Sequence, residues 1–144
     1  MSPVSTVSAP GVAALQAALA AEHAAVYGYG VVGSMLAGAG QSAARTDWIA
    51  HQVARDTLVT MLTKLGATPV AASPAYRLPF AVTNAQSAEK LAATLEEGVT
   101  RAYLGVVAVS DPTLRSFGAQ AMQASAKRAV AWSGSTQAFP GLPA

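Results

Sequence analysis

The sequence predicts an all-α protein that folds as an up-down four-helix bundle. Four long segments repeat apolar residues at alternating steps of three and four, which places those residues on one face of a helix. Glycine or proline residues separate each segment from the next. With 144 residues, the chain has the length of one domain with a single core. We expect residues 1–9 to be disordered and residues 10–144 to form the bundle.

The first predicted helix, over residues 10–38, places a carboxylate on its apolar face. Glu22 stands in the middle of a face that is otherwise suited to packing. A glutamate turned into a bundle either binds a metal ion or joins a buried polar network. Gly28, Gly30 and Gly33 lower helix propensity by roughly 1 kcal/mol each, and we attribute them to the close approach of a neighbouring helix. The whole face consists of Leu15, Leu19, Glu22, Val26, Tyr29, Gly33 and Leu36.

The second predicted helix, over residues 41–65, turns His51 toward the same interior. The connection that follows, over residues 67–82, contains Pro69, Pro74 and Pro79, which exclude a long helix. When extended, this connection reaches about 50 Å, whereas the preceding helix is about 38 Å long. We therefore predict a long crossover that runs the length of the bundle and makes the second and third helices parallel.

Capping patterns predict where the last two helices begin. Thr83, with Gln86 three residues later, is typical of a capping box and predicts the start of the third helix. Asp111 followed by Pro112 predicts the start of the fourth, with the aspartate as N-cap and the proline at the first helical position. The fourth helix is expected to continue to about Ser133.

A weak internal repeat relates the first helix to the third. EHAAVYGYGVV, which begins at Glu22, and EGVTRAYLGVV, which begins at Glu97, share the glutamate and the final Gly-Val-Val. Helical geometry instead places Glu96 nearer the apolar face and turns Glu97 away, where it can pair with Arg101. We give more weight to the helical geometry and expect Glu96 in the core, with Glu97 as the alternative.

The composition excludes several classes of function. Charged residues make up 11% of the chain, against about 25% in average proteins. We therefore expect part of the surface to be buried against a protein partner, most simply in a homodimer. A net charge of +2 without a basic stripe argues against nucleic acid. The uncharged stretch 24–44 contains five glycines, so we expect no stable membrane insertion. The absence of cysteine and of a signal-peptide pattern favours a cytoplasmic location.

Sequence motifs along most of the chain resemble a known family. The inward-facing Glu22 and His51, the long crossover and the stretch Leu95-Glu96-Glu97-Gly98 are together similar to the ferritin-like superfamily. More narrowly, residues 12–143 resemble an actinobacterial ferritin-like family, the domain of unknown function 4439. This resemblance implies the bundle fold and no established activity for the family, while the superfamily implies di-iron chemistry. The segments that carry it are ALAAEHAAVYGYGVVG, HQVARD, GATPVAASPAYRLPF, LEEGVTRAY and AFPGLP.

The di-iron pattern of that superfamily is incomplete in this sequence. The pattern takes one glutamate from each of two helices and a Glu-x-x-His pair from each of the other two. Glu22 fits, and either Glu96 or Glu97 fits. His51 lacks its glutamate because Trp48 stands three residues before it, and the last predicted helix contains no aspartate, glutamate or histidine. We therefore predict that an intact di-iron site is absent.

A buried ion-pair network is predicted in its place. In this interpretation Arg55 and Arg128 neutralise the carboxylates of Glu22, Glu96 and Asp56 through hydrogen-bonded pairs. Such a network needs no metal ion. It would connect the first, second, third and fourth helices through charged side chains.

Two functional interpretations follow from these residues. The first is a metal-free structural or protein-interaction module without a cofactor, which we expect not to be an enzyme. The alternative is a metal-storage protein or metal-dependent oxidoreductase with a degenerate mononuclear site, in which Glu22, His51 and Glu96 hold one Fe, Mn or Zn ion. We favour the first because the last helix offers no group that binds a cation. The candidate site residues are Glu22, His51, Arg55, Asp56, Glu96, Glu97 and Arg128.

Overall fold

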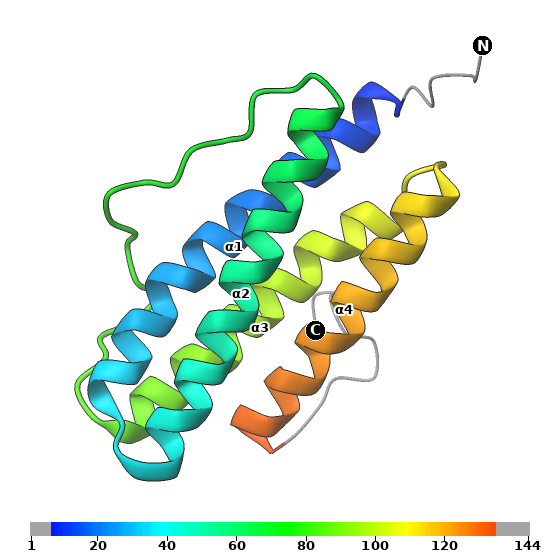
Figure 1. The fold of residues 1–144 in the computed structure, drawn as a ribbon. Helices are drawn as coiled ribbons and strands as arrows, with labels where there is room; N and C mark the ends of the chain where they lie inside the picture. Colours follow the sequence, from blue (N-terminus) through cyan, green and yellow to red (C-terminus); the bar gives the residue numbers. More distant parts are fainter. Residues whose placement is uncertain (1–6, 135–144) are drawn as a thin grey trace.

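The computed structural model describes residues 7–134, which form four α-helices and no strand (Figure 1). The helices are α1 (Ala9–Met35), α2 (Gly38–Lys64), α3 (Ala85–Val107) and α4 (Pro112–Ser133). α1 packs against α2 and α3, and α3 packs against α4, whereas α2 and α4 are packed less closely. The prediction of an all-helical protein with four helices is confirmed.

The start of α1 is capped by a serine side chain. Ser8 is its N-cap, since the Ser8 hydroxyl accepts a hydrogen bond from the Gly11 amide at 3.3 Å. Val7 already packs against the hydrophobic core, so the ordered chain begins before the boundary that we placed at residue 10. Residues 1–6, and residues 135–144 that we assigned to the bundle, lie outside the described residues.

A short link joins α1 to α2, and its glycines act differently from our expectation. α1 ends at Met35, and the next residue, Leu36, has an extended backbone and a buried side chain. Gly38 has a φ of +57° and is the first residue of α2. This left-handed conformation strains any residue with a β-carbon, which explains the glycine. Gly38 therefore begins the second helix and does not end the first.

Of Gly28, Gly30 and Gly33 in α1, only Gly28 marks a close helix contact. A β-carbon at Gly28 would clash with Leu95 of α3, so this glycine lets the two helices approach. At Gly30 and Gly33 a β-carbon would meet nothing within 4 Å. The explanation by close approach is therefore wrong for Gly30 and Gly33.

α3 begins with a capping box one residue later than predicted. The Asn84 side chain accepts a hydrogen bond from the Ser87 amide at 2.8 Å, and the Ser87 hydroxyl accepts one from the Asn84 amide at 3.1 Å. The prediction of Thr83 and Gln86 as the capping pair is therefore wrong. Both pairs have the same spacing, and asparagine is the stronger N-cap residue of the two.

α4 begins and ends as predicted. The Asp111 carboxylate accepts a hydrogen bond from the Leu114 amide at 3.0 Å, and Gly134, with a φ of +72°, follows the last helical residue. Gly118 allows close packing on α3, because a β-carbon at this position would lie 2.9 Å from Val106.

The connection between α2 and α3 runs along the outside of α1 (Figure 1). The Val70 amide donates to Gln16 Oε1 at 2.8 Å, and His23 Nε2 lies 2.9 Å from the Val70 carbonyl oxygen. Further along, the Tyr76 ring packs against Tyr27 with ring centroids 5.5 Å apart. The partners on α1 thus advance toward its C-terminal end as the connection proceeds. The connection therefore leads from the end of α2, along α1, to the start of α3.

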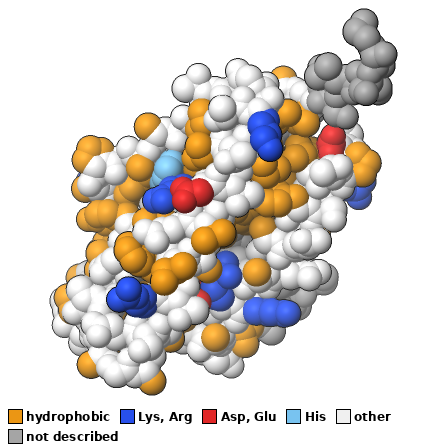
Figure 2. All heavy atoms as spheres, in the orientation of Figure 1, with side chains coloured by type: hydrophobic (Ala, Val, Ile, Leu, Met, Phe, Trp, Pro, Cys, Tyr) orange, Lys and Arg blue, Asp and Glu red, His pale blue; other side chains and the backbone are white. Residues whose placement is uncertain are grey.

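Two hydrophobic clusters fill the interior, and the buried polar side chains lie between them. One cluster surrounds Leu19, Leu62 and Val106, and the other surrounds Val32 and Leu91. None of the described helices is long and apolar enough to cross a membrane. On the face shown in Figure 2, charged groups are scattered among hydrophobic and uncharged surface. The buried polar side chains are Glu22, His51, Glu96, Thr100 and Ser125.

Candidate functional site

Three side chains from three helices meet inside the bundle. Glu22 of α1, His51 of α2 and Glu96 of α3 are each at most 1% exposed. His51 Nδ1 lies 2.5 Å from Glu22 Oε2, and His51 Nε2 lies 2.7 Å from Glu96 Oε1. The imidazole therefore bridges the two carboxyl groups and uses both of its ring nitrogens to do so.

Two buried tyrosines cross-link the same carboxyl groups. The Tyr103 hydroxyl on α3 donates to Glu22 Oε1 on α1 at 2.7 Å. In return, the Tyr29 hydroxyl on α1 donates to Glu96 Oε1 on α3 at 2.7 Å. Each of these two helices thus contributes one glutamate and one tyrosine to a reciprocal pair of hydrogen bonds.

α4 contributes a hydroxyl and a guanidinium, both of which bind Glu96. The Ser125 hydroxyl donates to Glu96 Oε2 at 2.5 Å. Arg128 Nε donates to Glu96 Oε1 at 2.9 Å, and its side chain is 23% exposed. Arg128 therefore links the buried carboxyl group to the protein surface.

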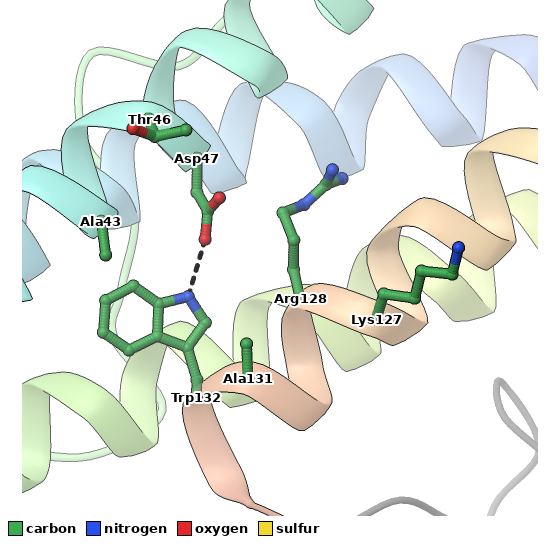
Figure 3. Close-up of a pocket in the computed structure, with 7 residues that line it drawn as sticks. All are labelled: Ala43, Thr46, Asp47, Lys127, Arg128, Ala131 and Trp132. Atoms are coloured by element: carbon green, nitrogen blue, oxygen red, sulfur yellow. Dashed lines mark hydrogen bonds between the residues drawn. The ribbon is translucent and has the colours of Figure 1, made fainter.

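Asp47 extends the network toward the surface between α2 and α4. Its Oδ2 accepts a hydrogen bond from Trp132 Nε1 at 2.8 Å (Figure 3) and lies 3.4 Å from the Tyr29 hydroxyl. Asp47 stands one helical turn before His51 but does not orient the imidazole, because the His51 nitrogens are both directed at glutamates.

The two glutamates make His51 a cation at neutral pH. Burial by itself lowers the pKa of this imidazole, because a charge is poorly solvated in the core. The hydrogen bonds to Glu22 and Glu96 and the charges of these two side chains outweigh burial and raise the pKa to about 9. Both ring nitrogens then carry protons and donate to the carboxyl groups.

The same contacts act in the opposite direction on their partners. Burial raises the pKa of Glu96, but the hydrogen bond and charge of His51 and the charge of Arg128 outweigh it, so the pKa is lowered. Burial and the adjacent carboxylates raise the pKa values of Tyr29 and Tyr103. The tyrosines are therefore neutral hydrogen-bond donors to the carboxyl groups at physiological pH.

Three of the residues assigned to the network from the sequence lie outside it. Arg55 Nε binds Asp56 Oδ1 at 2.9 Å on the surface, where the two side chains are 30% and 69% exposed. Glu97 is exposed, whereas Glu96 is buried. The expectation that Arg55 neutralises a buried glutamate is therefore wrong, and His51 and Arg128 are the cations that contact the buried carboxyl groups.

Sequence reasoning missed Tyr29, Tyr103 and Ser125 as members of the network, and it aligned the internal repeat one residue out of register. A shift of 74 positions along the chain, instead of the shift that pairs Glu22 with Glu97, superimposes the buried groups of the two helical hairpins. The signal in the sequence is the Glu-x₆-Tyr spacing that the first and third helices share. The matched pairs are Glu22 with Glu96, Tyr29 with Tyr103, and His51 with Ser125.

The buried polar side chains of the described residues are bound to one another. Within residues 7–134, no group of three or more His, Cys, Asp or Glu side chains is arranged to hold a metal ion. Every buried side-chain nitrogen and oxygen of this part of the chain already has a hydrogen-bond partner. A metal ligand needs a free lone pair, whereas both nitrogens of His51 carry protons that bind glutamates.

Comparisons with known proteins agree with the helical fold. The crystal structure of a conserved hypothetical protein, rv2844, from Mycobacterium tuberculosis is 32% identical to this chain, with a TM-score of 0.84. The similarity covers 88% of this chain and 96% of the mycobacterial chain. No curated protein matches. A family model described as Domain of unknown function (DUF4439) matches residues 14–144, and this chain belongs to that family.

Proposed function

We propose that the protein is a metal-free, ferritin-like scaffold that acts by binding protein partners, and that it is not an enzyme. One observation carries the proposal: the His51 imidazole lies between two buried glutamates, with one ring nitrogen within hydrogen-bond distance of each. A protonated imidazole there supplies the positive charge that a metal ion supplies in a di-iron bundle. The buried network thereby stabilises the fold without offering an open coordination position.

The positions that hold metal in ferritin-like bundles support this interpretation. Such bundles use one glutamate from each of two helices and a Glu-x-x-His pair from each of the others. Glu22 and Glu96 match the single glutamates. Trp48 and His51 stand at one pair and Met122 and Ser125 at the other, so three of the six ligand types are replaced. The connection from α2 to α3 corresponds in this proposal to the long crossover of those folds.

The free energy needed to deprotonate His51 argues against the alternative function, a mononuclear Fe, Mn or Zn site. A metal ion can bind the imidazole only after a proton leaves, and the pKa of His51 is about 9. At pH 7 this deprotonation costs about 3 kcal/mol, since one pKa unit corresponds to about 1.4 kcal/mol. The guanidinium of Arg128, at 2.9 Å from Glu96 Oε1, adds repulsion toward a second cation.

Elemental analysis separates the two functions. The protein is expressed in medium supplemented with iron, manganese and zinc, purified without chelators, and assayed for bound metal. We expect far less than one metal ion per chain for the native protein and for Glu22→Gln. Glu97→Gln is the matched control, because this carboxylate is exposed. Metal that binds one to one in the native protein and in Glu97→Gln, and is lost in Glu22→Gln, would contradict the proposal.

Exposed apolar side chains on α2 support a partner surface. Ile49 and Val53 lie one turn apart and are 45% and 61% exposed. Such a pair on a surface with few charges is suited to burial against another protein. We propose a homodimer through this face as the simplest partner arrangement.

Sedimentation equilibrium tests this part of the proposal. The native protein should form a dimer at micromolar concentration, and Val53→Glu should shift it to monomer without changing its helix content. Thr60→Glu, at an exposed position on the same helix, is the control for added charge alone. Weak dimers have dissociation constants on the order of 100 micromolar. A native protein that stays monomeric up to this concentration would rule out the homodimer.

A further inference from the structure

We propose that a surface pocket between α2 and α4 binds a small organic anion with a planar apolar body. The pocket has a volume of about 380 Å³ and lies where these two helices are packed less closely. Asp47 of α2 forms one wall, and Arg128 and Trp132 of α4 form the other (Figure 3). This volume lies in the lower part of the range for small-molecule sites.

The charge of the pocket favours an anion. Lys127 and Arg128 both line it, against the single carboxylate of Asp47. Within the described residues, Arg128 makes a hydrogen bond only through Nε, to Glu96, and Lys127 forms no ion pair. The two terminal nitrogens of Arg128 therefore keep their protons available for a carboxylate, which a guanidinium binds in a planar, two-pronged geometry.

The shape of the pocket favours a flat, apolar body next to the charged group. Figure 3 shows Arg128 and Trp132 rising from α4 side by side, with the small side chain of Ala131 between them and Ala43 beyond the indole. The hydrogen bond to Asp47, at 2.8 Å, holds the Trp132 ring in place. A fixed indole face beside small side chains leaves room for an aromatic ring to pack.

A second polar group on the ligand would have partners on α2. Asp47 uses Oδ2 for Trp132 and Tyr29, so its other oxygen is free to accept a hydrogen bond within the described part of the chain. The Thr46 hydroxyl donates to the Ser42 carbonyl at 3.1 Å and retains its capacity as an acceptor. A phenolic hydroxyl opposite the carboxylate matches this wall, so a hydroxybenzoate has the chemistry that the pocket requires.

Two-dimensional NMR of the full chain tests the site, with 4-hydroxybenzoate as the probe. The indole N–H of Trp132 lies in the pocket, whereas Trp48 lies outside it and serves as a control within the same molecule. We expect the Trp132 signal to shift with a Kd below about 1 mM, while the Trp48 signal shifts much less. 4-Hydroxybenzamide, which has the same shape without the charge, should bind at least about tenfold more weakly.

Substitutions at exposed positions establish where the probe binds. Lys127→Gln should weaken binding about tenfold, and Ala131→Phe should abolish it by filling the pocket. Both residues are exposed, so neither change should disturb the fold. Arg115→Gln, which removes an exposed cation elsewhere on α4, should leave the affinity unchanged. Equal binding of the benzamide, no shift of Trp132, or unchanged affinity in Lys127→Gln and Ala131→Phe would each overturn the proposal.

Discussion

The α1–α2 hairpin and the α3–α4 hairpin present the same frame to the core but neutralise their glutamates differently. Glu22 accepts hydrogen bonds from His51 and Tyr103, and the only cation among these partners is the imidazole. Glu96 accepts hydrogen bonds from four side chains, which are His51, Tyr29, Ser125 and Arg128. Two of these, His51 and Arg128, are cations. The imidazole of the first hairpin is thus shared by both glutamates, whereas the guanidinium of the second serves only one.

This asymmetry shows how the stability of two similar helical hairpins can come to depend on one side chain. At the position that matches His51, the second hairpin carries Ser125, whose hydroxyl satisfies an oxygen but supplies no charge. Two carboxylates that face each other in a core repel each other unless a cation or a shared proton lies between them. The stability of both halves therefore depends on the residue at position 51. The predictions below test that dependence, from the largest expected effect to the smallest.

Removal of the imidazole should have the largest effect. We expect His51→Ala to lower the free energy of unfolding by about 4 kcal/mol, because it leaves two carboxyl groups in the core without their shared cation. Urea unfolding followed by circular dichroism measures the change. His23→Ala is the control, because this half-buried histidine binds the Val70 carbonyl oxygen and lies apart from the two buried glutamates' hydrogen bonds. A loss below 1 kcal/mol in His51→Ala would contradict the shared-cation interpretation.

Alkaline pH should reproduce most of that loss without a mutation. The pKa of His51 is raised from 6.5 to about 9, so the folded protein binds this proton more tightly than the unfolded chain. Its stabilising contribution is complete below pH 6.5 and disappears as the pH rises through 9. We expect the free energy of unfolding to fall by about 3 kcal/mol across this window. In His51→Ala the decrease should be absent, and an equal decrease there would assign it to another group.

Acid should destabilise the protein through the other partner. The pKa of Glu96 is lowered below its ordinary value of 4.5, so its contribution is present above that pH. The contribution disappears as the pH falls through the lowered pKa of the folded state. The protein should therefore be most stable between about pH 4.5 and 6.5. In a pH series of urea unfolding curves, a maximum below this window would contradict the assignment of Glu96, and a maximum above it would contradict that of His51.

The two tyrosines should have equal and intermediate effects. We expect Tyr29→Phe and Tyr103→Phe each to cost about 2 kcal/mol, because each removes one hydrogen bond from a buried carboxyl oxygen. Thermal or urea unfolding of both variants provides the comparison. A difference of more than 1 kcal/mol between them would show that the reciprocal pair is not energetically symmetric. Tyr29 differs from Tyr103 in that its hydroxyl also lies near Asp47.

The surface ion pair should have the smallest effect. Arg55→Ala should change the free energy of unfolding by less than about 0.5 kcal/mol, because the pair with Asp56 is exposed to water. Arg128→Ala should cost more, since its guanidinium binds a fully buried carboxyl group. Comparable losses in the two variants would argue against the distinction between the surface pair and the buried network.

Local sequence patterns predicted much of the architecture, and they did so where neighbours along the chain decide the structure. The three- and four-residue periodicity identified four helices, and Asp111-Pro112 located the start of α4. Helical geometry also distinguished Glu96 from Glu97, because the angle between consecutive residues on a helix is set by the backbone. Where two cap patterns compete, as before α3, their spacing alone does not decide, and the structure has Asn84 as the N-cap.

The amino-acid sequence by itself determined which helical faces turn inward, and hence that carboxyl groups and an imidazole are buried. Only the tertiary structure decided which partners they have. The height of one helix against the next brings Tyr103 to Glu22 and Arg128 to Glu96, and it leaves Arg55 at the surface with Asp56. The reason is physical: periodicity sets rotation about a helix axis, whereas contacts between helices depend on their relative translation, which packing of the whole core establishes.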